Sequence, residues 1–142
     1  MAEPRTRLDP ADDLAVRNLV ARLAMMADTA PIDALEDYLA CFTDEAVWES
    51  PTEVRRGIAE VRLGAEERRR AGAQGPGTHG RHVISTQGVW ADGEDRAVSE
   101  SYFMAVGDTV GTPTPRVVGY YRDELARTPT GWRIAHRHVT FG

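Results

Sequence analysis

Lysine is absent from this chain of 142 residues, and all 17 basic residues are arginine. Schiff-base chemistry needs a lysine amine, so lysine aldolases and pyridoxal-phosphate enzymes are excluded. P-loop hydrolysis is excluded as well, because the loop requires its lysine. Cys41 is the only cysteine, which leaves no intrachain disulfide and no zinc site made of several thiolates. We interpret Cys41 as a small core residue, because it lies on an apolar stretch.

Long apolar runs and an excess of positive charge are also missing. No run approaches the roughly 20 residues needed to cross a bilayer, and Met1 to Pro10 lacks the apolar region of a secretory signal. The net charge of −5 disfavours nucleic acid as a partner, since phosphate binding requires a basic face. Hydrophobic residues make up 42%, an ordinary globular share. We expect one cytoplasmic domain over residues 1–142, with its core at about 9–141.

Periodicity and turn signals place helices early in the chain and strands late. Asp9-Pro10 predicts a helix start, and apolar residues recur at helical spacing until Thr29-Ala30-Pro31 ends that helix. Asp92-Gly93 predicts a hairpin turn, and the glycine-rich residues 71–80 predict a flexible loop. The expected elements are helices at about 9–29, 32–42 and 57–70, and strands at about 46–50, 82–90, 96–106, 116–127 and 132–141.

This order predicts an α+β fold in which helices cover one face of a curved antiparallel sheet. A central pocket remains wherever the helices do not fill that face. Alternation along the last strand places on one face Trp132, Ile134, His136 and His138. We expect this face to point inward, which puts His136 in the pocket or at its rim.

Four segments resemble SnoaL-like domains of the nuclear transport factor 2-like superfamily: VARLAMMADTAPIDALEDYLACFTDEAVWES, RRGIAEVR, HVIST and VVGYYRDELARTPTGWRIAHRHV. The resemblance covers about residues 12–140 and implies a cone-shaped fold with a central pocket. The superfamily includes scytalone dehydratase, ketosteroid isomerase and polyketide cyclases. It also includes dioxygenase β subunits and noncatalytic members, so the fold does not assign a function by itself.

The resemblance to the dehydratase branch implies a catalytic role for two residues, Asp28 at the end of the first helix and His82 at the start of the strand after the loop. His82 would be the general base and Asp28 its partner. An imidazole, with an ordinary pKa of about 6.5, can accept a carbon-bound proton next to a carbonyl at neutral pH. A buried carboxylate fixes the tautomer of the ring and stabilises the imidazolium that forms.

One position departs from the dehydratase pattern, because Leu23 stands where several such enzymes carry a tyrosine. The group that stabilises or protonates oxygen would then have to come from elsewhere, and the candidates are Tyr102, Tyr120, Tyr121 and His136. Tyr120 and Tyr121 are neighbours on a strand and face opposite ways, so one is expected in the core and one at the surface. The predicted substrate-binding set is Trp48, Tyr102, Tyr120 and His136.

The histidines form two close pairs, His79 with His82 and His136 with His138. Such pairs can ligate a metal together with a carboxylate, here Glu49 or Glu100. Neither spacing is specific for a metal, and the first pair lies in or beside the glycine-rich loop. We therefore predict no metal and no cofactor.

Two classes of function stay open. The first is an enzyme that uses cofactor-free acid–base chemistry, as a dehydratase, isomerase or cyclase, on a polyketide-like or cyclic carbonyl compound. The second is a noncatalytic ligand-binding or assembly module resembling a dioxygenase β subunit. A deep pocket with Asp28 and His82 within hydrogen-bond reach would favour the enzyme. A pocket plugged by Leu23, Met25, Met26 or Trp48 would favour the module. The resemblance also implies a homodimer, formed through the outer face of the sheet.

Overall fold

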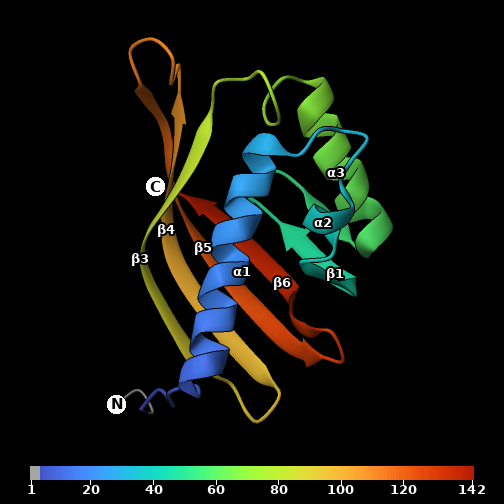
Figure 1. The fold of residues 1–142 in the computed structure, drawn as a ribbon, viewed down its shortest axis with the longest axis vertical. Helices are drawn as coiled ribbons and strands as arrows, with labels where there is room; N and C mark the ends of the chain where they lie inside the picture. Colours follow the sequence, from blue (N-terminus) through green and yellow to red (C-terminus); the bar gives the residue numbers. More distant parts are fainter. Residues whose placement is uncertain (1–3) are drawn as a thin grey trace.

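The computed structural model describes residues 4–142. Met1–Glu3 lie outside the described residues; they begin the N-terminal segment that we expect not to be a secretory signal. The helices are α1 (Pro10–Thr29), α2 (Glu36–Leu39) and α3 (Ile58–Arg70). α1 lies across one face of a curved sheet, and α2 and α3 lie beside β1 (Phe42–Glu49) (Figure 1). Within residues 4–142, no helix is long and apolar enough to cross a membrane.

The sheet has six strands in the order β2-β1-β6-β5-β4-β3. Besides β1 they are β2 (Val54–Arg56), β3 (Arg81–Ala91), β4 (Arg96–Gly107), β5 (Thr114–Thr128) and β6 (Gly131–Phe141). This confirms the α+β class and the curved sheet. The sheet is antiparallel, as expected, except that β1 runs parallel to β6. β2 was not expected, since three residues are too few to show alternation.

The first helix begins as the sequence predicts. Asp9 is its N-cap and accepts a hydrogen bond from the backbone N–H of Ala11 at 2.9 Å, and Pro10 occupies the first turn. The second helix is shorter than expected, because the chain from Phe42 onward forms β1 instead. Ile134 of β6 donates its N–H to the carbonyl of Cys41 at 2.7 Å, so pairing with a distant strand overrides the local helical pattern.

A β-bulge in β6 makes the second half of the strand face the opposite way from the orientation that simple alternation predicts. Leu125 of β5 pairs with Ile134, but Glu124 pairs with His136, so Ala135 is an extra residue on β6. Side chains that follow the bulge therefore change face. Arg137 is buried, whereas the side chains of His136 and His138 are 28% and 43% exposed. The expectation that His136 points into the pocket is wrong for this reason.

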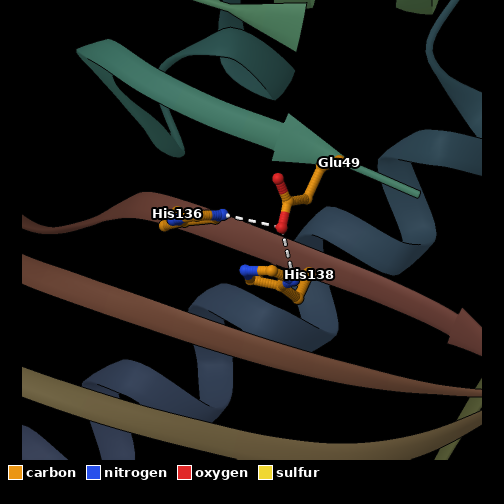
Figure 2. A group of neighbouring side chains, drawn as sticks. All are labelled: Glu49, His136 and His138. Atoms are coloured by element: carbon orange, nitrogen blue, oxygen red, sulfur yellow. Dashed lines mark ion pairs between the residues drawn. The ribbon is translucent and has the colours of Figure 1, made fainter. Parts of the chain in front are cut away.

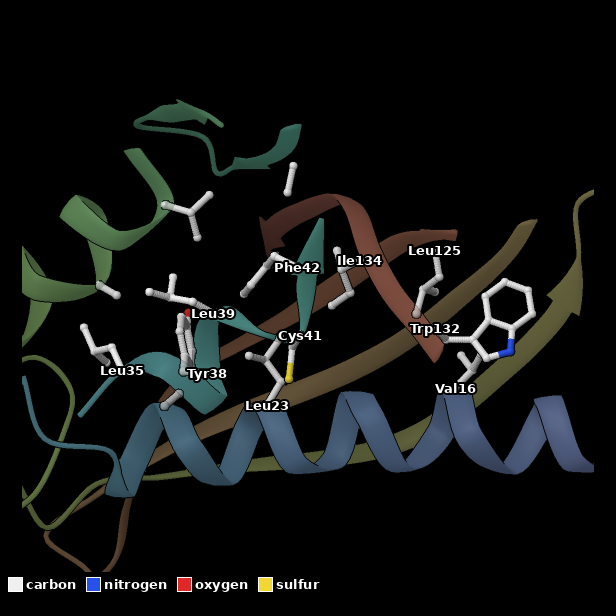
Figure 3. Close-up of a cluster of buried hydrophobic side chains, with 14 of the residues drawn as sticks. Val16, Leu23, Leu35, Tyr38, Leu39, Cys41, Phe42, Leu125, Trp132 and Ile134 are labelled. Carbon is white, nitrogen blue, oxygen red and sulfur yellow. The ribbon is translucent and has the colours of Figure 1, made fainter. Parts of the chain in front are cut away.

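The main hydrophobic core lies between α1 and the inner face of the sheet, as Figure 3 shows. α1 contributes Val16 and Leu23, which face Phe42 of β1 and the buried residues of β5 and β6. Burying a side chain of this size stabilises the fold by about 1.5–3 kcal/mol. Cys41 belongs to this core, and its burial raises the pKa of the thiol. The interpretation of Cys41 as a core residue is confirmed.

A second, smaller cluster of buried residues lies further along the inner face of the sheet. It consists of Phe103 of β4, Tyr121 of β5 and Val139 of β6. Trp48 packs against both this cluster and the main core. The pocket described below is lined by side chains from both clusters.

Candidate active site

A cavity of about 350 Å³ opens between the C-terminal half of α1 and the inner face of the sheet. Apolar and aromatic side chains make up much of its wall. The lining includes Leu23, Ala24 and Ala27 of α1, Tyr38, Trp48 of β1, Arg68 and Gln74, His82 of β3, Phe103 and Ala105 of β4, Val117 and Tyr121 of β5, and Arg137 and Val139 of β6. Leu23 and Trp48 form part of the wall and do not fill the cavity.

His82 lines this cavity, and it meets Asp28, which together with His82 lines an adjoining pocket. The ring Nδ1 of His82 lies 2.7 Å from Oδ1 of Asp28, and the backbone N–H of His82 donates to Oδ2 at 2.9 Å. His82 therefore contacts both oxygens of the Asp28 carboxylate. Asp28 is only 6% exposed, so the carboxylate is also shielded from water. With Nδ1 engaged by the carboxylate, Nε2 is the ring nitrogen left to exchange a proton.

The local fold holds Asp28 in place from three sides. Asp28 follows Ala27 on the buried stripe of α1. Arg69 of α3 donates to the carbonyls of Met26, at 3.1 Å, and Ala30, at 2.7 Å, which satisfies the C-terminal end of that helix. Burial lowers the pKa of Arg69. Gly75 of the glycine-rich loop donates its N–H to the carbonyl of Ala27 at 3.1 Å, so the loop is anchored over the helix end.

β5 and β6 contribute to the cavity wall Tyr121 and Arg137, and Arg137 belongs to a buried ion pair. Arg137 donates to Asp123 through Nε at 2.7 Å and Nη2 at 2.8 Å, and the two residues are 5% and 0% exposed. Burial disfavours the charge of Arg137, but the Asp123 carboxylate outweighs this effect and raises the pKa. The guanidinium lies 4.1 Å from the ring centre of Tyr121, which stacks on Phe103 at 4.1 Å.

Tyr121 remains protonated at neutral pH. Burial raises the pKa of its phenol to about 12, even though Arg137 acts in the opposite direction. The side chain can therefore donate a hydrogen bond to a ligand oxygen in the cavity. Arg137, which also lines the cavity, adds a fixed positive charge on the same wall.

The predicted substrate-binding residues divide between the two faces of the sheet. Trp48 lines the cavity, as the sequence predicts, and the guanidinium of Arg68 lies 4.6 Å from its ring centre. The placement of Tyr102 and Tyr120 in the pocket is wrong. They pair across β4 and β5 on the outer face, with ring centres 6.3 Å apart, and Tyr102 is 55% exposed.

Alternation along the strands explains this outcome. Phe103 and Tyr121 point inward, so the residues before them, Tyr102 and Tyr120, point outward. The expectation that one tyrosine of the Tyr120-Tyr121 pair is buried is confirmed, and Tyr121 is the inward one. His136 lies on the outer face because of the bulge at Ala135.

Sequence reasoning did not identify Arg137 as a pocket residue. The available signal was the acidic residue Asp123 on the preceding strand, because opposite charges facing each other across a hairpin often pair. The bulge at Ala135 shifts the pairing so that Asp123 lies directly opposite Arg137. Without knowledge of the bulge, simple alternation assigns Arg137 to the solvent-facing side.

Residues of the types that ligate metals lie close together away from the cavity. Glu49, His136 and His138 form a cluster on the outer face, drawn in Figure 2. His79 lies in the glycine-rich loop and is exposed. Glu100, the other candidate carboxylate ligand, lies 3.8 Å from the guanidinium of Arg122 on the neighbouring strand.

The profile of the family described as SnoaL-like domain matches residues 10–138, which is most of the chain. The chain belongs to the SnoaL-like domain family. This assignment agrees with the resemblance found in the sequence and with the curved sheet over α1. No curated protein sequence matches this SnoaL-like domain.

Solved structures with the same fold include proteins of very different description. A protein of unknown function with a cystatin-like fold from Nostoc punctiforme is 21% identical, with a TM-score of 0.82 over 96% of both chains. ActVI-ORFA from Streptomyces coelicolor is 19% identical, with a TM-score of 0.75 over 91% of this SnoaL-like domain and 96% of that chain. A scytalone dehydratase-like protein from Novosphingobium aromaticivorans is 16% identical, with a TM-score of 0.73 over 93% and 85%. At these identities the likeness concerns the fold.

Proposed function

We propose that this SnoaL-like domain is an enzyme that performs cofactor-free acid–base chemistry on a cyclic or polyketide-like carbonyl compound. The observation that carries the proposal is the Asp28–His82 pair, joined at 2.7 Å, whose His82 lines a largely apolar cavity. A buried carboxylate that orients an imidazole is an arrangement suited to a general base. The scytalone dehydratase-like fold relative supports loss of water as the reaction.

His82 would act as the base through Nε2. It takes the proton from the carbon next to the carbonyl, and the carbonyl oxygen becomes an enolate oxygen. Asp28 stabilises the imidazolium that results. In a dehydration, the enolate re-forms the carbonyl as the hydroxyl on the next carbon leaves. The imidazolium returns its proton to that hydroxyl, so water departs and His82 is neutral again.

Tyr121 and Arg137 are proposed to stabilise the enolate oxygen. They replace, from β5 and β6, the hydroxyl that is missing at Leu23. Tyr121 donates a hydrogen bond, and Arg137 supplies positive charge in a wall that excludes much of the water. This role does not require that either group change its protonation state.

A noncatalytic ligand-binding module is the second candidate function. The observation in its favour is Leu23, which stands where several dehydratases of this type carry a tyrosine. In this alternative the cavity binds the same apolar carbonyl compounds, but Asp28 and His82 only hold the helix end against β3. The two candidates differ in one measurable respect, namely whether a bound compound exchanges its α-proton.

The experiment is a proton-exchange assay with a panel of cyclic β-hydroxy ketones in D₂O, followed by NMR. The enzyme is expected to catalyse exchange at the α-carbon and loss of water. Asp28→Asn and His82→Ala should each lower the rate by about 10²-fold or more while circular dichroism shows an intact fold. His79→Asn, in the exposed loop, is the matched control and should keep the rate. Full activity in both pocket variants would remove the mechanism, and binding without exchange would favour the module.

A further inference from the structure

A group of titratable side chains on the outer face of the sheet is not used by the proposed mechanism. His136 and His138 are two residues apart on β6, after the bulge, and therefore point to the same face. Glu49 is the last residue of β1 and pairs directly with His138 in the parallel register. Figure 2 shows the Glu49 carboxylate reaching toward both rings.

The ligand atoms of these three residues lie within 4.8 Å of one another. Oε1 of Glu49 is 3.4 Å from Nε2 of His136 and 2.5 Å from Nδ1 of His138. Nitrogen and oxygen ligands about 2.0–2.1 Å from a tetrahedral ion are separated from one another by roughly 3.3 Å. The Glu49–His136 distance already matches this separation. The Glu49–His138 contact is shorter than this separation and must lengthen when an ion binds.

An unsatisfied nitrogen gives independent support. Nε2 of His136 is buried and has no hydrogen-bond partner within residues 4–142. Buried polar atoms in folded proteins nearly always have a partner, so this nitrogen calls for an explanation. It faces the Glu49 carboxylate, which is where an ion held by that carboxylate would sit. A bound cation would satisfy the nitrogen and the carboxylate together.

The surroundings of His136 also fit a ligand. Glu124 of β5 is paired with His136 across the sheet, and its Oε2 lies 3.6 Å from Nδ1 of that ring. Histidine ligands commonly present their second ring nitrogen to a carboxylate, which fixes the tautomer and directs the other nitrogen at the metal. Here that arrangement leaves Nε2 of His136 directed at Glu49.

We propose that Glu49, His136 and His138 bind one divalent transition-metal ion, with Zn²⁺ the ion that best fits two imidazoles and one carboxylate. Three protein ligands leave a fourth position to water. The ion would tie the ends of β1 and β6 together on the face opposite the cavity. This proposal departs from the sequence-based expectation of no metal. It does not depend on the proposed function, because the cluster and the Asp28–His82 pair share no residue.

The test is a titration of the tag-free protein, stripped with a chelator and dialysed, with ZnCl₂ by calorimetry and with CoCl₂ by visible absorption. One ion per chain is expected to bind, with Co²⁺ absorption bands typical of nitrogen ligation. Glu49→Gln and His138→Asn should each weaken binding by more than tenfold, and Glu124→Gln by about 10-fold to 100-fold. His79→Asn keeps the cluster and should leave binding unchanged.

Several outcomes would overturn the proposal. They are the absence of Zn²⁺ and Co²⁺ binding to the wild-type protein, unchanged affinity in Glu49→Gln and His138→Asn, and loss of binding in His79→Asn. If a variant does not fold, NMR spectra of the wild-type protein with added Co²⁺ still test whether the ion binds at this site. Paramagnetic Co²⁺ should shift or broaden the ring signals of His136 and His138 first. An effect confined to His79 or His82 would place the ion elsewhere and reject the site.

Discussion

Asp123 and Arg137 are the only oppositely charged partners in the described part of the chain that are both buried on the inner side of the sheet. Each alone would be a charge removed from water, which costs several kcal/mol. Together they form two short hydrogen bonds and place a guanidinium against the ring of Tyr121. The pairing with Asp123 therefore allows the charged guanidinium of Arg137 to be buried in the cavity wall.

We expect Arg137→Met to lower the free energy of unfolding by about 3–5 kcal/mol, because it leaves the Asp123 carboxylate buried without a partner. The double variant Asp123→Leu with Arg137→Met should recover most of this loss, since it removes both charges. Urea unfolding of the two single variants and the double variant measures the coupling. Additive losses in the double variant would contradict the prediction.

At the scale of elements, hydrogen bonds connect the first turn of α1 to the end of β5 and the start of β6. Asp12 accepts hydrogen bonds from both Nη atoms of Arg127, at 2.9 and 2.8 Å, and from Nε1 of Trp132 at 2.9 Å. These contacts, that of Arg127 first, lower the pKa of Asp12 from its usual 3.8 to about 2. These three hydrogen bonds join residues more than 100 positions apart in sequence.

Because the pKa of Asp12 is lower in the folded protein, its ionised form stabilises the fold above pH 4. That stabilisation is lost as the pH falls toward 2. We expect Asp12→Asn to be less stable than the wild-type protein at neutral pH, and the difference to shrink between about pH 4 and 2. Thermal unfolding as a function of pH measures this effect, and NMR titration of the Asp12 carboxyl carbon measures the pKa directly.

Trp132→Phe removes one hydrogen-bond donor to Asp12 and should raise the pKa of Asp12 part of the way toward its usual value. An Asp12 that titrates near 4 in the wild-type protein would contradict the prediction.

At the scale of the whole molecule, the two faces of the sheet have different partners. The inner face holds α1, the core and the cavity, whereas the outer face has no covering helix in the described part of the chain. Val83, Tyr102 and Val118 of β3, β4 and β5 are 47%, 55% and 55% exposed on this outer face. Exposed apolar side chains on adjacent strands are typical of an interface.

We therefore expect the protein to form a homodimer through the outer face of β3, β4 and β5. Val118→Glu should shift the protein toward monomer at micromolar concentration, because a charge would have to be buried in the interface. Val110→Glu is the matched control, since Val110 is 78% exposed in the loop between β4 and β5. Light scattering and sedimentation measure the mass. A wild-type protein that sediments as a monomer would remove this expectation.

Much of the architecture follows from local sequence signals. The cap at Asp9, the stop near Pro31 and the turn at Asp92-Gly93 act within a few residues, so the sequence predicts the boundaries of α1 and of the β3–β4 hairpin closely. The family resemblance added Asp28 and His82 as partners, and the structure brings them together across 54 positions of sequence. Their catalytic role stays a prediction until the exchange assay is done.

The sequence alone determined the α+β class, the order of the major elements and the family. Apolar periodicity and turn residues are local properties, and they survive folding. Only the tertiary structure decided which side chains face the cavity. A single extra residue at Ala135 reverses the second half of β6, which buries Arg137 and brings His136 and His138 to Glu49 on the outer face. Such a bulge arises from pairing with β5 and β1, and pairing between distant strands leaves no local mark in the sequence.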